Sequence, residues 1–290
     1  MIKKAILLVA GYGTRFLPAT KNMPKEMLPV VDKPIIQYLV EEVVAAGIEE
    51  IIFVTGRGKR SIEDHFDKSF ELEHNLVEKN KKELLEDVRG ISNLAKFTYV
   101  RQGEPKGDGN ALLCARHLVK DEPVAVLFGD DIVDSKVPAI KQLMDVYEKY
   151  KDPVVCLQKV PRNQVSQYGI VKGIKVADRI YEVNGFVEKP KIKEAPSNLA
   201  IVGKYIITPE VFSAIEAGGT SAGGEQRLAD GFIELLKTKP IYGCEFEGKR
   251  FDCGSKIGFL KATVEFGLKH KETKEEFTKY LKNLTIKNDA

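Results

Sequence analysis

The sequence lacks the spacings that mark the common metal and redox sites. None of its four cysteines stands in a C-x-x-C pair, so neither a zinc ribbon nor a redox dithiol is predicted, and reduced, mostly buried thiols are expected. The four histidines are equally isolated, without an H-E-x-x-H spacing, so no histidine-based metal site is predicted. The residues concerned are Cys114, Cys156, Cys244, Cys253, His65, His74, His117 and His270.

Long apolar runs and an excess of one charge are also missing. The apolar run near the start covers only residues 5–10, whereas the core of a signal peptide uses about 7–15 residues. No stretch approaches the length of a membrane span. The 45 Lys and Arg against 42 Asp and Glu give a net charge of +3, without the basic clusters typical of nucleic-acid-binding proteins. These absences favour a cytoplasmic protein that binds neither nucleic acid nor a membrane.

The first half of the chain alternates short apolar runs with helical patterns. Residues 5–10, 51–54, 97–100 and 124–128 are continuous and apolar, which predicts buried strands. Between the first two, residues 35–47 repeat Ile, Leu and Val at helical spacing and end at a glycine. This strand–loop–helix–strand order predicts an α/β fold in which helices cover the faces of a parallel sheet.

The second half has a more antiparallel, α+β character. Charged helices are expected over residues 59–96, which precede it, and a further helix near 111–117. An apolar stripe at helical spacing lies within residues 277–284, and it indicates either core packing or an oligomer contact. The strands predicted in this half cover residues 154–160, 170–176, 180–187 and 241–246.

A glycine- and proline-rich loop covers residues 11–34, directly after the first predicted strand. It fails the dinucleotide fingerprint because Phe16 takes the place of the third glycine, and no G-x-x-x-x-G-K-[ST] loop occurs in the chain. Gly11 and Gly13 nevertheless let backbone N–H groups approach an anion. Three cations share the loop, namely Arg15, Lys21 and Lys25. The loop is either a phosphate site or a flexible surface segment, and composition leaves both open.

Acidic residues follow strands at two further places. Asp130 and Asp131 come directly after the strand at 124–128, where carboxylates suit Mg²⁺, although a turn or helix cap is the alternative. Asp252 is a second candidate metal ligand. Glu188 and Lys189 end another predicted strand and could hold sugar hydroxyls and a phosphate. Each of these signals is weak when taken alone.

Taken together, these segments resemble the signature of the sugar-1-phosphate nucleotidyltransferases, and in particular the bacterial UTP–glucose-1-phosphate uridylyltransferase family. Residues 24–29 read PKEMLP, 195–200 read APSNLA and 250–255 read RFDCGS. The matching segments occur in family order over nearly the whole chain. They are 11–18, 24–29, 54–57, 101–107, 129–131, 167–169, 187–190, 195–200 and 250–255.

The resemblance implies a fold class and an organisation. We expect one α/β domain over residues 1–290 with a Rossmann-like, three-layer nucleotidyltransferase fold and a mostly parallel, mixed central sheet. Within it, residues 1–135 would form the nucleotide-binding part and 136–255 a smaller α+β part that binds the sugar phosphate. Residues 256–290 would form C-terminal helices. A homodimer or homotetramer is expected as well.

The resemblance also implies a reaction. UTP and glucose 1-phosphate would give UDP-glucose and pyrophosphate with Mg²⁺ as the cofactor. The sugar phosphate would attack the α-phosphorus of UTP in line, which needs alignment of two repelling anions and neutralisation of charge. Two alternatives remain: the same transfer with another base or sugar, such as dTTP or galactose 1-phosphate, and a non-catalytic regulatory relative that keeps the fold.

Site residues follow from the family positions. Backbone groups near Gly11 and Gly13, with Arg15, would hold the triphosphate, and Lys25 would lie on the α-phosphate or the departing pyrophosphate. Glu26, Gln102 and Gly107 would read the uracil edge. The implied catalytic residues are Arg15, Lys25, Asp130 and Lys189. The implied nucleotide-binding residues are Ala10, Gly11, Gly13, Thr14, Glu26, Gln102, Gly107 and Asp131. The implied sugar-phosphate residues are Gly169, Glu188, Lys189 and Gly203, and the implied Mg²⁺ ligands are Asp130 and Asp252.

The chain departs from the family pattern at two segments. Where the family usually continues Lys-Gly-Leu-Gly-His-Ala, residues 106–111 read KGDGNA, so Asp108 adds negative charge near the expected triphosphate. Where the family often shows Glu-Ile-Gln-Leu-Thr-Asp, residues 225–230 read EQRLAD. We expect the first departure to weaken nucleotide binding or alter base preference, and the second to affect the sugar pocket.

Overall fold

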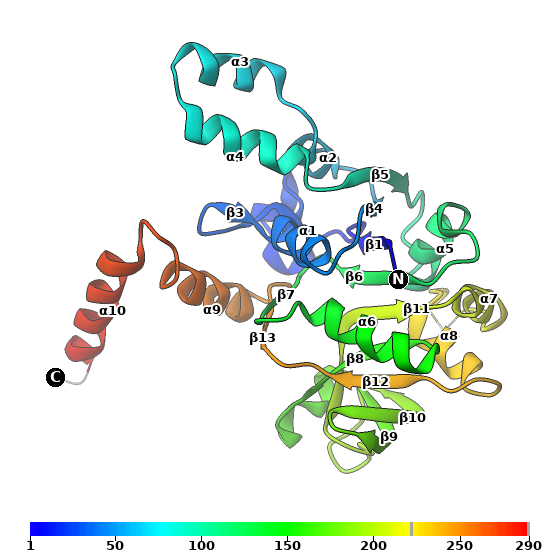
Figure 1. Ribbon diagram of the computed structural model, residues 1–290. Coiled ribbons are helices and arrows are strands. Elements are labelled where there is room, and N and C mark those ends of the chain that lie inside the picture. Colours follow the sequence, from blue (N-terminus) through cyan, green and yellow to red (C-terminus); the bar gives the residue numbers. More distant parts are fainter. Residues whose placement is uncertain (221–222, 289–290) are drawn as a thin grey trace.

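The computed structural model describes residues 1–220 and 223–288, with side chains of the last helix described as far as Leu284. Its centre is a nine-stranded mixed sheet (Figure 1). In order across the sheet the strands are β5 (Lys96–Arg101), β4 (Glu50–Thr55), β1 (Lys4–Leu8), β6 (Val124–Phe128), β11 (Leu199–Ile207), β8 (Val154–Lys159), β12 (Tyr242–Glu245), β10 (Ile180–Glu188) and β9 (Gly169–Ala177). Two short pairs accompany it, β13 (Lys249–Asp252) with β7 (Asp131–Asp134) and β2 (Pro29–Val30) with β3 (Lys33–Pro34).

The first four strands form a parallel block, as the sequence predicts. β1 pairs in parallel with both β4 and β6, and β5 joins β4 in parallel. Side chains alternate between the faces: Leu7 packs into the core cluster of α1 (Ile35–Ala45), and Ile6 packs into the cluster of α5 (Asp108–Val119). Because parallel strands end at the same edge, the loops that follow β1 and β6 meet there.

β11 joins the parallel block to the rest of the sheet, and the sequence analysis did not predict it. It runs antiparallel to both β6 and β8. Its sequence is a continuous apolar run broken by Lys204, whose side chain is fully buried. Lys204 Nζ lies 2.7 Å from Oε2 of Glu42 on α1, so the charge is neutralised inside the core. The apolar run was the signal for this strand, and the buried lysine obscured it.

The strands predicted in the second half are present as β8, β9, β10 and β12. β9 and β10 form an antiparallel hairpin and β10 pairs antiparallel with β12, whereas β12 runs parallel to β8. Helix α6 (Ala139–Tyr150) packs on the core cluster of α1. Helices α7 (Pro209–Ala217) and α8 (Leu228–Leu235) pack on the cluster of α5, so they lie beside the start of that helix.

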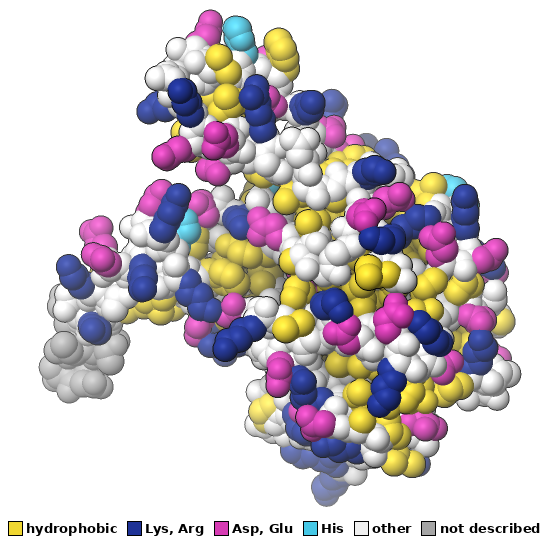
Figure 2. Space-filling view, viewed as in Figure 1, with side chains coloured by type: hydrophobic (Ala, Val, Ile, Leu, Met, Phe, Trp, Pro, Cys, Tyr) yellow, Lys and Arg dark blue, Asp and Glu magenta, His cyan; other side chains and the backbone are white. Residues whose placement is uncertain are grey.

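Two pairs of helices extend from the body. The charged segment at 59–96 forms helices as predicted, α2 (Arg60–Phe66), α3 (Phe70–Glu78) and α4 (Lys82–Ser92), and the last two make a protruding hairpin (Figure 1). Figure 2 shows many charged side chains over that hairpin. At the other end, α9 (Lys256–Gly267) and α10 (Lys274–Asn288) lead away from the sheet. None of the helices in the described ranges is long and apolar enough to cross a membrane.

The observed architecture is the expected mixed α/β fold with helices on both faces of one sheet. The sheet is not mostly parallel as expected, because five of the nine pairings among its described strands are antiparallel. Parallel pairing is confined to the first four strands and to β8 with β12, and β11 introduces the antiparallel part. The boundary expected near residue 135 falls between β7 and α6, and the one near 255 falls before α9. The sheet continues across the first of these, so the division into parts stays a prediction about function.

Candidate active site

The loop after β1 consists of three short 3₁₀ turns. They are η1 (Thr14–Phe16), η2 (Ala19–Lys21) and η3 (Lys25–Met27). Gly13 has a φ of 67°, which favours glycine, and the Thr20 hydroxyl donates a hydrogen bond of 2.7 Å to its carbonyl oxygen. A side-chain carbon at Gly13 would lie only 3.2 Å from Cβ of Lys25. The loop therefore folds back on itself and brings its glycine turn against Lys25.

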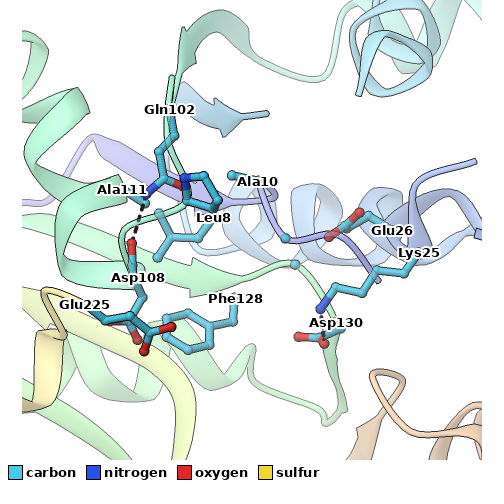
Figure 3. Close-up of a pocket in the computed structure, with 14 residues that line it drawn as sticks. Leu8, Ala10, Lys25, Glu26, Gln102, Asp108, Ala111, Phe128, Asp130 and Glu225 are labelled. Atoms are coloured by element: carbon cyan, nitrogen blue, oxygen red, sulfur yellow. Dashed lines mark hydrogen bonds and ion pairs between the residues drawn. The ribbon is translucent and has the colours of Figure 1, made fainter. Parts of the chain in front are cut away.

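A first cavity lies at the carboxyl ends of β1 and β6, and Figure 3 shows the residues around it. Leu8 and Phe128 give it apolar walls, while charged and amide groups lie at both ends. Its lining residues are Leu8, Ala10, Gly11, Lys25, Glu26, Gln102, Pro105, Gly107, Asp108, Ala111, Phe128, Gly129, Asp130 and Glu225. An apolar cavity with a few convergent polar groups is the usual form of a small-molecule site.

Lys25 and Asp130 form an ion pair at one end of this cavity, and Figure 3 shows their side chains pointing toward each other. The two side chains are 21% and 17% exposed. Burial alone would lower the pKa of Lys25, but the carboxylates of Asp130 and Glu26 outweigh it and raise that pKa above its usual value. Lys25 therefore stays charged and can neutralise phosphate oxygens.

Glu26 is fully buried beside the same cavity, and Lys59 Nζ donates a hydrogen bond of 2.7 Å to its Oε2. Burial raises the pKa of Glu26, while Lys59 and Lys25 oppose that rise. Its other oxygen, Oε1, has no hydrogen-bond partner among the residues that the structure describes. A buried acceptor left unpaired is costly, so it suits a donor on a bound ligand. The sequence analysis missed Lys59, whose only signal was a Gly-Arg-Gly-Lys run after β4.

Asp131 has a different role from the nucleotide contact expected of it. Its Oδ1 lies 2.6 Å from Arg250, and its Oδ2 accepts a hydrogen bond of 3.0 Å from the backbone N–H of Gly203. The Asp131 carboxylate thereby ties β7 to β13 and β11. Gly203 was expected in the sugar pocket, but it lies in this joint, where a side-chain carbon would come within 2.8 Å of Asp131 Oδ2. Protein groups thus occupy both oxygens of Asp131.

Asp252 approaches Asp130 through the pairing of two short strands. β13 pairs antiparallel with β7, which places Asp252 opposite Asp131. A side-chain carbon at Gly254 would contact carboxylate oxygens of both Asp130 and Asp252, so the two carboxylates border the same small space. The Arg15 guanidinium donates a hydrogen bond of 3.4 Å to the Gly254 carbonyl oxygen from the side of the loop after β1. Residues from both ends of the chain therefore converge here.

The opposite end of the first cavity carries the amide of Gln102 together with the carboxylates of Asp108 and Glu225. Figure 3 shows Gln102 on the far side from Lys25. Gln102 is 7% exposed, and its Nε2 donates a hydrogen bond of 3.0 Å to the Gly107 carbonyl oxygen. Helix α5 begins at Asp108, within the segment expected to be a loop, and Oδ1 of Asp108 accepts hydrogen bonds from the backbone N–H groups of Gly109 and Leu228.

A second cavity lies beside the β9–β10 hairpin and the start of α8. Lys189 has a φ of 44° and is 63% exposed, and its Nζ lies 3.4 Å from Oε1 of Glu188. A side-chain carbon at Gly169 would lie 3.0 Å from Oε2 of Glu188, so the glycine leaves room for that carboxylate. The lining residues are Gly107, Asp108, Gly169, Phe186, Val187, Glu188, Lys189, Ile201, Glu225, Arg227, Ala229, Asp230 and Ile233.

The two cavities adjoin. Gly107, Asp108 and Glu225 line both of them. One cavity thus offers an ion-paired lysine and two acidic groups at one end, and the Gln102 amide with two further carboxylates at the other. The adjoining cavity offers an exposed lysine and a carboxylate. Two phosphorylated ligands could meet in such a cleft.

Comparison with known proteins agrees with this geometry. Residues 4–267 match the family described as nucleotidyl transferase. The chain belongs to the nucleotidyl transferase family. It is 52% identical over 288 residues to a UTP–glucose-1-phosphate uridylyltransferase of Bacillus subtilis (strain 168), and the alignment covers 99% of each chain.

Solved structures of nucleotidyl transferases are similar over nearly the same span. One described as UTP-bound UGPase from Acinetobacter baumannii has a TM-score of 0.90 and 40% identity, covering 97% of this chain and 99% of that chain. Another, a UDP-glucose pyrophosphorylase complexed with UDP-glucose, has a TM-score of 0.85 and 42% identity, covering 93% of this chain and 100% of that chain. The expected fold is thereby confirmed.

Most of the site residues predicted for a nucleotidyl transferase line the two cavities. The first is lined by Ala10, Gly11, Lys25, Glu26, Gln102, Gly107 and Asp130, and the second by Gly169, Glu188 and Lys189. Six others lie outside both linings, namely Gly13, Thr14, Arg15, Asp131, Gly203 and Asp252. Three of these six contact residues at the edge of the first cavity. Gly13 packs on Lys25, while Arg15 and Asp252 border Gly254, which lies against the Asp130 carboxylate.

A nucleotidyl transferase handles phosphates, and two carboxylates are placed to hold a divalent ion. Within residues 1–220 and 223–288, no group of three or more His, Cys, Asp and Glu side chains forms a metal site. Mg²⁺ typically needs only one or two protein carboxylates, because substrate phosphates and water complete its shell. Asp130 and Asp252, which border one space beside Gly254, fit that requirement.

Proposed function

We propose that this chain transfers the uridylyl group of UTP to glucose 1-phosphate and releases pyrophosphate. The observation that carries the proposal is the pair of adjoining cavities, which share Gly107, Asp108 and Glu225. The nucleotide would occupy the first cavity and the sugar phosphate the second. Residues 1–135 and 136–255 then provide most of the nucleotide side and the sugar side respectively. The curated relative in Bacillus subtilis carries the name of this reaction.

The chemistry needs no covalent intermediate with the protein. An oxygen of the glucose 1-phosphate phosphate attacks the α-phosphorus of UTP, a new P–O bond forms, and the bond to the β-phosphate oxygen breaks as pyrophosphate leaves. The protein must hold two anions in line and neutralise the charge that develops. Lys25 is charged at the nucleotide end, and we assign it to the α-phosphate or the leaving pyrophosphate.

The other side chains position the substrates. Backbone groups of Gly11 and Gly13 with Arg15 hold the triphosphate, while Gln102 and Gly107 read the uracil edge. On the sugar side, Lys189 holds the phosphate of glucose 1-phosphate and Glu188 accepts hydrogen bonds from glucose hydroxyls. Both residues are at least half exposed, at 63% and 50%, which leaves them accessible to a ligand.

Glu26 and the metal ligands complete the nucleotide side. The free Oε1 of Glu26 accepts a hydrogen bond from the nucleotide, and Lys59 keeps that carboxylate in place. Asp130 and Asp252 are the residues that would hold Mg²⁺. When bound, the ion would bridge and neutralise phosphate oxygens.

The two departures from the family pattern favour a second candidate, which is the same transfer with another base or sugar. Asp108 lines both cavities, and Arg227 and Ala229 line the second. These are the positions at which dTTP or galactose 1-phosphate would be distinguished from the proposed substrates. A panel of four nucleoside triphosphates against several sugar 1-phosphates decides between the candidates.

Pyrophosphate release tests the proposal directly. Purified protein with UTP, glucose 1-phosphate and Mg²⁺ is expected to release pyrophosphate and form UDP-glucose in equal amounts. UTP binding without any turnover at high protein concentration would instead identify a regulatory relative. Faster turnover with another pair of substrates would replace UTP or glucose 1-phosphate in the proposal.

The proposal also covers the cellular location and the oligomeric state of the enzyme. We place it in the cytoplasm, and we expect a homodimer or homotetramer. Exposed apolar side chains on α9 and α10 offer a contact surface, with Ile257 62% and Tyr280 57% exposed. Light scattering is expected to give a multiple of the 32.4 kDa chain mass, and a mass of one chain would contradict the oligomer.

A further inference from the structure

The two departures from the family pattern lie against each other. The backbone N–H of Gln226 donates a hydrogen bond of 2.8 Å to the Lys106 carbonyl oxygen, and the Gly109 N–H donates one of 3.0 Å to the Gln226 carbonyl oxygen. Gly107 has a φ of 101°, and a side-chain carbon there would collide with the Gln226 carbonyl oxygen. Residues 106–110 and 225–228 therefore form one unit, which we call the clasp.

A chain of three amide side chains runs through the clasp. Gln102 Nε2 donates a hydrogen bond of 2.9 Å to Oδ1 of Asn110, and Asn110 Nδ2 donates one of 3.2 Å to Oε1 of Gln226. The same Nε2 of Gln102 also donates to the carbonyl oxygen of Gly107 at 3.0 Å. A backbone carbonyl can only accept, so it fixes which end of the Gln102 amide is the NH₂ group. Both N–H groups of Gln102 are thus used inside the protein.

This arrangement leaves one group of Gln102 for a ligand. An amide has two N–H donors and one oxygen, so Oε1 remains as an acceptor. Gln102 lines the first cavity, at the end away from Lys25. Uracil carries one donor on its pairing edge, N3–H, between two carbonyl acceptors. Cytosine carries a lone pair at N3, so in the same pose its N3 would meet the Gln102 oxygen acceptor to acceptor; its donor on that edge is the neighbouring 4-amino group.

Asp108 holds the clasp closed from the other side. Its Oδ1 accepts hydrogen bonds of 2.8 Å from the Gly109 N–H and 2.9 Å from the Leu228 N–H. It therefore satisfies backbone donors at the first turns of both α5 and α8. Asp108 is half-buried, and its charge is directed at the starts of two helices, although the sequence analysis expected it to face a triphosphate.

We propose that Asn110 is a positioning residue that, together with the Gly107 carbonyl oxygen, holds the Gln102 amide with its oxygen free for the base, and that Gln226 in turn fixes Asn110, so that selection of uracil over cytosine depends on the clasp. The inference rests on the proposed function, because it assigns the base end of the nucleotide to Gln102. If the proposal is right, the base preference of the first cavity depends on the clasp. The clasp also lines the second cavity through Glu225.

The test compares kcat/KM for UTP, CTP and dTTP in the full-length enzyme and its variants. Asn110→Leu removes both side-chain bonds of Asn110, and we expect the preference for UTP over CTP to fall by about tenfold, the size of one hydrogen bond. The UTP to dTTP ratio should stay constant, because thymine presents the same N3–H. Asn110→Asp is the matched control: it retains an acceptor for Gln102, and the Gln226 amide can turn to donate to it. We expect its UTP to CTP preference to stay within about threefold of the unmodified protein.

Gln226→Leu gives a second route to the same answer, in case Asn110→Leu does not fold. It leaves Asn110 unfixed, and the preference for UTP over CTP is expected to fall by about threefold, with a constant UTP to dTTP ratio. A merely structural role would lower kcat/KM for all three nucleotides together, and this result would overturn the proposal. An unchanged UTP to CTP ratio in both variants would overturn it as well.

Calorimetric binding of UTP and CTP to the protein without sugar phosphate separates this inference from the proposed function. If the unmodified protein prefers UTP in binding but makes no UDP-glucose, the reaction assignment is wrong while the base selection stands. If it binds UTP and CTP equally, the role of Asn110 is wrong even where turnover is observed.

Discussion

The nucleotide side and the sugar side of the cleft are built in different ways. On the nucleotide side the chemical groups already have partners inside the protein: Lys25 pairs with Asp130, and Lys59 pairs with Glu26 in a site where both side chains are at most 5% exposed. On the sugar side, Lys189 and Glu188 are 63% and 50% exposed, and their nearest charged atoms are 3.4 Å apart. The first side is preorganised by burial, whereas the second is open.

Buried and exposed charges should therefore contribute differently to the stability of the protein and to the binding of its ligands. A buried and paired charge affects both the folding of the protein and the geometry of the reaction, because removing one partner leaves the other unpaired. An exposed charge contributes little to stability, so its main effect is on the ligand. Substitutions on the nucleotide side should therefore change stability and rate, and those on the sugar side should change affinity alone. The predictions below run from the largest expected effect to the smallest.

Breaking the Lys59–Glu26 pair should have the largest effect. Lys59→Met leaves the fully buried Glu26 without its partner, and we expect the free energy of unfolding to fall by about 3–5 kcal/mol. Urea denaturation measures this. The KM for UTP should rise as well, since Glu26 lines the first cavity.

The control for that prediction is a second buried pair outside the site. Lys204→Met breaks the pair with Glu42, where the two side chains are 0% and 8% exposed. We expect a similar loss of stability, about 3–5 kcal/mol, but no change in the KM for UTP. Equal KM changes in both variants would mean that Lys59 acts only through the fold.

The next largest effect is expected for the ion-paired lysine of the nucleotide side. Lys25→Ala should lower kcat by about 10²-fold or more, because the charge acts mainly in the transition state. Steady-state pyrophosphate release measures kcat, and a denaturation curve establishes that the variant is folded. An unchanged kcat would remove Lys25 from that role.

The α/β fold class could be predicted from the sequence, because short apolar strands alternate with helical patterns. The site residues were predicted from the family resemblance, because each local signal was weak when taken alone. β11 was missed, since Lys204 interrupts its apolar run and the compensating Glu42 is 162 positions away in the chain. Lys59 was missed for the same kind of reason, its partner lying 33 residues away. Asp131 was given a nucleotide role from its family position, whereas its pairing with Arg250 is visible only in three dimensions.

The exposed lysine of the sugar side should have a smaller and different effect. Lys189→Ala should raise the KM for glucose 1-phosphate by about tenfold and leave the unfolding midpoint unchanged, because an exposed pair adds at most about 1 kcal/mol. Lys191→Ala is the matched control. That residue is 85% exposed and faces Glu194, so its removal should change neither quantity. A loss of stability in Lys189→Ala would contradict the contrast between the two sides.

The smallest effect on stability is expected for an exposed ion pair outside both cavities, Lys239 with Glu210. The hydrogen bond and ion pair with Lys239 lower the pKa of Glu210 from 4.5 to about 2. A lowered folded-state pKa stabilises the protein above the unfolded pKa, and this contribution is lost as the pH falls from about 4.5 through 2. The two side chains are 44% and 45% exposed, so Glu210→Gln should cost under about 1 kcal/mol at pH 7. The cost should be smaller at pH 2, where about half of the Glu210 carboxyl is protonated.

A structure of the protein with UDP-glucose tests the central claim most directly, since that claim is that two adjoining cavities hold the two halves of one reaction. We expect the uracil beside Gln102 and Gly107 in the first cavity and the glucose beside Glu188 in the second. The diphosphate should pass between them near Lys25 and Lys189. A UDP-glucose molecule bound with its uracil in the second cavity, or away from both, would contradict the account.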